Sequence, residues 1–125
     1  MKTVEFNGLK LVLSTKQKIQ LERALGNQSP LNVIFKMVGT MDTQEQELDL
    51  SQMQLPSLEF LVLVLFHASQ KLNSGINQEK MYDIVDSYLE DNHSVMDLFQ
   101  IVLQVLQVSH YLPEAVEEEQ AVEEE

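Results

Sequence analysis

The segment Ser94–His110 limits how this chain can fold more than any other. Only Asp97, Gln100, Gln104 and Gln107 interrupt its run of apolar residues. These four are spaced by three, four and three residues, so on an α-helix they form one narrow polar stripe. The remaining apolar surface is wider than the face that a surface helix usually buries. We therefore expect this helix to be covered from more than one side, by the rest of the chain or by a partner.

Length and composition narrow the class of protein. The 125 residues suffice for one domain, which would bury roughly two-thirds of the surface of the unfolded chain. The chain has no cysteine, which excludes disulfides, thiolate metal sites and a cysteine nucleophile. The N-terminus has no apolar signal core, and the longest apolar run, residues 60–66, is far shorter than the ~20 residues that cross a bilayer. We expect a soluble cytoplasmic protein with no membrane partner.

The net charge of −12 is unevenly distributed along the chain. Residues 114–125 hold seven glutamates and no basic residue, and without those seven the net charge is −5. No dense basic patch is present, which argues against nucleic-acid binding because phosphate contacts dominate its affinity. We expect residues 1–112 to form one helical domain and residues 113–125 to be a disordered acidic tail.

The N-terminal residues predict a β-hairpin. Residues 2–6 and 9–13 flank Asn7-Gly8, and both central residues of a type I′ turn need a positive φ. A two-stranded hairpin is only marginally stable alone. The hairpin should therefore pack on helices.

Start and stop signals predict five helices after the hairpin. They cover residues 16–25, 30–38, 57–72, 78–91 and 94–110, and their starts carry Ser, Thr or Asn caps or a proline. Residues 40–55 are polar and predict a loop with at most one helical turn. The predicted fold class is mainly α, an N-terminal β-hairpin followed by about five helices packed as a small helical domain.

The three histidines do not predict a metal or catalytic site. His67, His93 and His110 lie on or beside three different segments. No histidine spacing places two ligands on one helical face. We expect local hydrogen bonding or simple exposure for these side chains, and no bound metal.

Three carboxylates share one helical face at Asp83, Asp86 and Glu90. Acid–base catalysis would need different burial to separate their pKa values. Their face lies opposite the apolar stripe of the same helix, which favours solvated charge. The chain also lacks a glycine-rich phosphate loop and a nucleophile elbow. We therefore expect no enzymatic activity and no cofactor.

Apolar helical surface is what remains to be explained. The segment 60–66 is apolar on nearly all sides and the segment 94–110 on most of its girth. These two helices are either the central pair of the core, or part of one lines a partner groove or an oligomer interface. The residues predicted to line such a groove are Phe60, Val64, Phe99, Leu103 and Leu106.

Several short stretches follow one another in the order of a known family. After the hairpin they are residues 21–27 (LERALGN), 30–35 (PLNVIF), 67–69 (HAS), 75–76 (GI), 81–83 (MYD), 94–98 (SVMDL) and 107–109 (QVS). Together they span about residues 1–112, and the set resembles the small tail assembly chaperones of long-tailed, siphovirus-type phages of Gram-positive bacteria. Residues 40–55 and the glutamate tail depart from that pattern.

The resemblance implies a mainly helical, non-enzymatic protein. Such chaperones are thought to coat the aggregation-prone tape measure protein and to help tail tube subunits polymerise around it. The implied partners are the tape measure protein and the tail tube protein, in the host cytoplasm, with the chaperone absent from the mature virion. Formation of a homo-oligomer is a further possibility, because one small core does not fully cover two apolar helices.

Two other classes compete with this interpretation. The acidity would suit a regulatory protein that mimics DNA and binds a host factor, which predicts carboxylates spaced on a rigid surface. A structural adaptor of the virion is the third class, and it predicts that the protein is present in purified particles.

Overall fold

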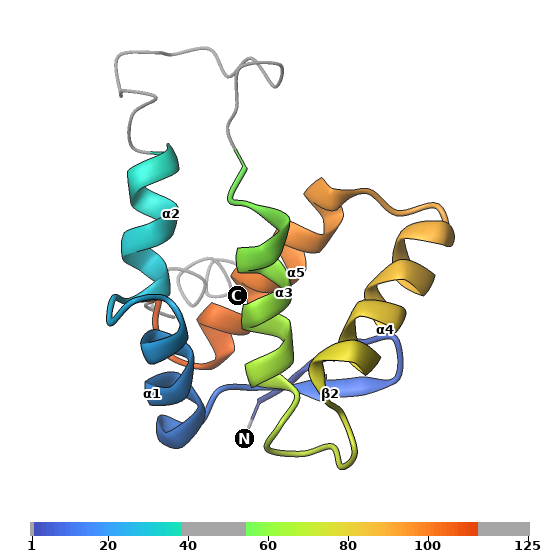
Figure 1. Cartoon of the computed structure of the whole chain (residues 1–125), viewed down its shortest axis with the longest axis horizontal. Coiled ribbons are helices and arrows are strands. Elements are labelled where there is room, and N and C mark those ends of the chain that lie inside the picture. Colours follow the sequence, from blue (N-terminus) through green and yellow to red (C-terminus); the bar gives the residue numbers. More distant parts are fainter. Residues whose placement is uncertain (1, 39–54, 113–125) are drawn as a thin grey trace, which may run out of the picture.

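The computed structural model describes residues 2–38 and 55–112 (Figure 1). These residues form a two-stranded antiparallel hairpin and five α-helices, which confirms the predicted fold class. The predicted loop of residues 40–55 lies outside the described residues except for Leu55. The predicted tail of residues 113–125 lies wholly outside them.

The hairpin forms where the Asn-Gly pair predicts it. Strands β1 (Val4–Phe6) and β2 (Leu9–Leu11) pair with Glu5 opposite Lys10. The intervening Asn7 and Gly8 have φ values of 47° and 88°, the left-handed region that both turn residues require. Strand β1 packs against the last helix, so the hairpin is covered as its marginal stability demands.

Two helices follow the hairpin, α1 (Thr15–Ala24) and α2 (Pro30–Val38). The chain leaves α1 through Gly26 at φ 81°, the conformation predicted for the glycine after a helix. The proline that opens α2 takes the first helical position, where a missing N–H costs nothing. Helix α2 buries Ile34 but leaves Phe35 exposed.

Helix α3 (Leu58–Ala68) is the centre of the fold and packs against α1, α4 and α5. The Ser57 side chain caps it by accepting a hydrogen bond from the Phe60 N–H at 3.1 Å. This is the most apolar helix, yet it has only 11 residues. Within the described ranges, no helix combines the length and apolarity needed to cross a membrane.

Helix α3 ends at Ala68, whereas the sequence predicted a helix to residue 72. The Ser69 hydroxyl donates a hydrogen bond to the Phe66 carbonyl at 2.7 Å. The Asn73 side chain donates one to the Ser69 carbonyl at 2.9 Å. Side chains thus take carbonyl groups that a continuing helix would use, and the chain turns instead.

The last two helices are α4 (Gln78–Glu90) and α5 (Val95–Val108). The Asn77 side chain caps α4. Ser94 and Asp97 form a reciprocal capping box at the start of α5, as their spacing predicted. These local caps fix where each helix begins.

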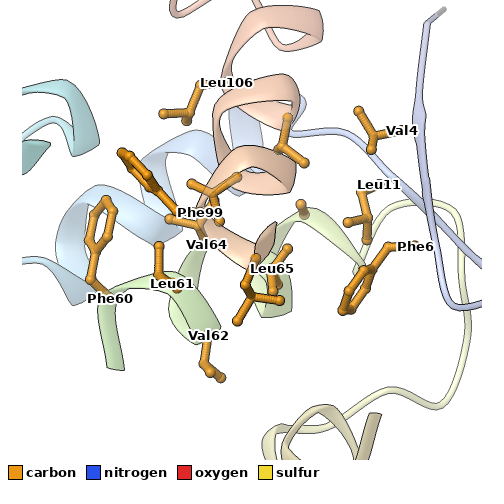
Figure 2. Close-up of a cluster of buried hydrophobic side chains, with 14 of the residues drawn as sticks. Val4, Phe6, Leu11, Phe60, Leu61, Val62, Val64, Leu65, Phe99 and Leu106 are labelled. Carbon is orange, nitrogen blue, oxygen red and sulfur yellow. The ribbon is translucent and has the colours of Figure 1, made fainter. Parts of the chain in front are cut away.

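A single buried cluster joins the hairpin to the helices (Figure 2). One edge of it is aromatic, with the Phe6 and Tyr88 ring centroids 5.0 Å apart. The His93 ring stacks on the Tyr88 ring, with the two ring centroids 3.9 Å apart. Figure 1 shows α4 on one side of α3, and α1 and α2 on the other side. Helix α3 therefore has neighbouring helices on both flanks.

Candidate protein-binding surface

The predicted groove between α3 and α5 is filled by side chains of the chain itself. Phe60, Val64, Phe99 and Leu106 are at most 7% exposed, and Figure 2 shows all four within the buried cluster. Leu103 is partly exposed. The two helices pack directly on each other, so their apolar faces occupy the space that a partner helix would need. Partner binding at these residues stays a prediction, and it would require α3 and α5 to separate.

The polar stripe of α5 faces water, as predicted. Asp97, Gln100 and Gln104 are exposed, and Gln107 is partly buried. The wide apolar face of α5 is turned towards the core, where Leu98, Val102 and related residues have no exposed surface. Burial by the chain itself therefore accounts for most of the apolar surface that made this helix unusual.

Open apolar surface lies instead on the side of α3 that faces α4. In Figure 2 the Val62 side chain points away from Phe99 and Leu106. Here the two helices border a pocket of about 340 Å³. The residues that line it are Leu58, Glu59, Val62, Leu63, Gln78 and Tyr82. We call this hollow the α3–α4 pocket.

The walls of the α3–α4 pocket follow from helical spacing. Leu58 and Val62 are four residues apart on α3, and Gln78 and Tyr82 are four residues apart on α4, so each pair lies on one helical face. Leu58 and Tyr82 are 45% and 47% exposed, whereas Val62 is 8% exposed. The pocket therefore has an apolar floor and two large, half-exposed side chains at its mouth.

Four carboxylates follow α4 on the flank next to Tyr82, which lines this pocket. With about 100° of rotation per residue, Glu79, Asp83, Asp86 and Glu90 all fall on one flank of Tyr82, away from the buried face of α4. All four are exposed, which confirms the solvated charge predicted for three of them. We call them the acidic flank of α4.

Opposite charge is scarce near the pocket. None of its lining residues is basic, and Glu59 adds a carboxylate from α3. Lys80 is exposed; helical geometry places it away from Tyr82 but next to Asp83, at the border of the carboxylate row. The surface around the pocket therefore attracts cationic groups.

The three histidines lie apart, in different environments. The Nδ1 atom of His67 is buried and has no hydrogen-bond partner among the described residues, and burial lowers the pKa of this imidazole. The Nδ1 atom of His93 lies 3.0 Å from the Tyr88 carbonyl oxygen. His110 is exposed just after α5. In the part of the chain that the structure describes, no cluster of three or more potential ligands is placed to hold a metal ion.

The sequence indicated the contribution of α3 to the pocket but not the contribution of α4. The apolar girth of residues 60–66 indicated that α3 has more apolar surface than one neighbour can cover. Tyr82, however, lies off the apolar stripe of α4, and nothing local says that α4 packs beside α3. The pocket depends on that long-range pairing.

A scan of protein-family models and searches of curated proteins and of solved structures find nothing that matches this chain. Within residues 2–38 and 55–112, the α3–α4 pocket with its acidic flank is a surface that suits a protein partner.

Proposed function

We propose that this protein is a tail assembly chaperone of a siphovirus-type phage. In this role it binds the tape measure protein, keeps it soluble and promotes polymerisation of the tail tube around it. The observation that carries the proposal is the open apolar α3–α4 pocket on a small acidic helical domain. The order of the family-like stretches along residues 1–112 supports this choice of family.

The pocket suits a transient hold on a helical client. A long helical protein offers apolar side chains along its faces until other subunits cover them. A shallow site that takes a few of these side chains gives weak contacts, which many copies along one client can add together and which tube subunits can displace. Holding a client in this way requires binding alone and no catalytic residue.

Charge supports the same role. The net charge is −12, and residues 114–125 contribute seven glutamates. A client coated with such chains carries a large negative charge, and like-charge repulsion opposes its aggregation. This explains why a protein with an apolar binding surface would also be strongly acidic.

Co-expression with the tape measure protein tests the proposal. We expect the tape measure protein to be insoluble alone and to become soluble and co-purify when this chain is present. An unrelated acidic protein of similar size is the control for charge alone. If the tape measure protein is equally insoluble with and without this chain, the proposal fails.

The proposed location distinguishes a chaperone from a virion adaptor. A chaperone acts in the host cytoplasm before the tail is complete and leaves the particle. Mass spectrometry of purified phage particles should therefore detect the tail tube protein and the tape measure protein without this chain. Its presence at a fixed ratio to other tail proteins would favour the adaptor.

A DNA-mimicking regulator is the second candidate, favoured by the four exposed carboxylates on the rigid helix α4. That role depends on charge and not on the pocket. Binding to a host DNA-binding protein that survives Leu58→Gln but is lost when the acidic flank is neutralised would favour it over the chaperone.

A further inference from the structure

We infer that the α3–α4 pocket binds an amphipathic helix that inserts a large apolar side chain between Leu58 and Tyr82 and lays basic side chains against the acidic flank of α4. This inference rests on the proposed function for the identity of the partner. The pocket and its surroundings determine which chemistry a partner needs.

Two exposed apolar side chains border the α3–α4 pocket. Among the described residues, the large apolar side chains that are clearly exposed are Ile19, Phe35, Leu58, Leu72 and Tyr82. Leu58 and Tyr82 also line the pocket, on two different helices. A side chain placed between them would cover both and reach the floor at Val62, which removes apolar surface from water.

Both helices present these residues from fixed starting points. Ser57 caps α3 and Asn77 caps α4 with side-chain hydrogen bonds, immediately before the lining residues Leu58 and Gln78. The mouth of the pocket is therefore built on capped helix ends, which need little ordering when a partner binds.

The acidic flank of α4 selects the charge of the partner. The acidic flank consists of Glu79, Asp83, Asp86 and Glu90, which follow α4 at helical spacings. A partner helix with Lys or Arg at similar spacings can face several of these carboxylates at once. Complementary charge of this kind raises the association rate and fixes which way the helix lies.

The same charge disfavours occupants from this chain. Residues 114–125 carry seven glutamates and no basic residue, and a second copy has a net charge of −12. Either would bring like charge to the acidic flank. The partner that fits is therefore a basic helix of another protein.

Synthetic helical peptides provide a direct test with the full chain. We would label three peptides of about 20 residues that share one leucine-rich face. They differ in the residues beside that face, which are Lys, Gln or Glu. Fluorescence anisotropy should show the tightest binding for the Lys peptide and the weakest for the Glu peptide, and the affinity for the Lys peptide should fall as salt increases.

Matched leucine variants test the pocket. Leu58 and Leu72 are each 45% exposed, but only Leu58 lines the pocket. We expect Leu58→Gln to weaken binding of the Lys peptide by at least about fivefold and Leu72→Gln to change it by less than about twofold. Tyr82→Ser provides an independent pocket variant, and circular dichroism checks that each variant folds.

Matched charge variants test the acidic flank. The triple change Asp83→Asn, Asp86→Asn and Glu90→Gln should weaken the Lys peptide and reduce its salt dependence. The control removes the same charge from residues 117–119 by Glu→Gln changes and should leave binding unchanged. Equal effects of the two triples would mean that net charge alone acts, which overturns the inference.

Three further results would also overturn it: binding of the Glu peptide as tightly as the Lys peptide, equal losses for Leu58→Gln and Leu72→Gln, or a dimer in sedimentation that Leu58→Gln abolishes. The last would assign the pocket to a second copy.

If the Leu58→Gln variant still keeps the tape measure protein soluble, the proposed function stands and the pocket is not its site. If the peptide results hold but the tape measure protein stays insoluble with the unchanged chain, the pocket inference stands and the proposed function fails.

Discussion

The Ser109 hydroxyl accepts a hydrogen bond at 2.8 Å from the backbone N–H of Leu13, which joins the end of α5 to the segment between β2 and α1. The preceding residue, Val12, donates its N–H to the Ala68 carbonyl at the end of α3, at 3.1 Å. Two successive backbone groups are thus held by the ends of the two central helices. The hairpin and α1 are positioned by these contacts between distant parts of the sequence.

Replacement of Ser109 by alanine should destabilise the fold. The Leu13 N–H and the Ser109 side chain are both buried, so the variant leaves a donor without a partner, which costs about 1–3 kcal/mol. Urea denaturation measures the change in unfolding free energy. Ser87→Ala, at an exposed position on α4, is the control and should change it little. Equal effects of the two variants would contradict a structural role for this hydrogen bond.

The Asn73 side chain should protect the outer edge of β2. Its Nδ2 atom donates to the Lys10 carbonyl at 2.8 Å, and its Oδ1 atom accepts from the Lys10 N–H at 3.2 Å. Asn73→Ala removes both of these bonds and also the bond to the Ser69 carbonyl, and we expect a loss of about 1 kcal/mol because the site is partly exposed. Hydrogen exchange should show faster exchange at the Lys10 amide. Asn32→Ala, which removes a hydrogen bond between two side chains on the surface, should leave that amide unchanged.

Features that local chemistry determines were predictable from the sequence. The Asn7-Gly8 turn and the Ser94–Asp97 capping box depend on residues that are close along the chain, and the structure has both. The end of α3 was missed because it depends on Asn73, whose side chain also bonds to Lys10 on the hairpin. A bond between residues 63 positions apart leaves no periodic signal in the sequence.

The candidate site was only partly predictable for the same reason. The pattern correctly marked α3 and α5 as unusually apolar helices. It could not say which faces they turn to each other, and so it left open whether Phe60 and Phe99 belong to the core or line a groove; both are buried. Tyr82 contributes to the pocket only because α4 lies beside α3.

The stability of the fold should decrease as the pH falls through the range where histidine titrates. Burial lowers the pKa of His67 below its ordinary value of 6.5, so the unfolded chain takes up the proton more readily than the folded chain. The resulting stabilisation is present above about pH 6.5 and is lost towards the lower pKa of the folded state. His67→Gln should reduce this pH dependence in denaturation between pH 5 and 8. An unchanged slope in the variant would show that other groups cause it.

The Tyr111 side chain should fasten the segment after α5 to α1. Its hydroxyl donates to the Glu22 carboxylate at 2.8 Å, and the Lys18 ammonium lies 5.4 Å from its ring centroid. Tyr111→Phe keeps the ring beside Lys18 but removes the hydrogen bond, so we expect a loss of about 1 kcal/mol in thermal or urea unfolding. Burial and the Glu22 carboxylate raise the pKa of the phenol, so this stabilisation is complete below pH 10 and decreases at higher pH. The same change at the exposed Tyr82 is the control for stability.

Two leucines on α5 test whether the residues predicted to line a groove belong to the core or to the surface. Leu106 has no exposed surface, whereas Leu103 is partly exposed, and both are interior positions of the same helix. Leu106→Ala should cost about 2–5 kcal/mol, because it removes buried apolar contacts and leaves a cavity. Leu103→Ala should cost clearly less, because part of this side chain already meets water and the site can relax. Urea denaturation of both variants measures the difference. Similar small losses for the two would mean that the α3–α5 interface is loosely packed and able to open, which would restore it as a candidate groove for the partner.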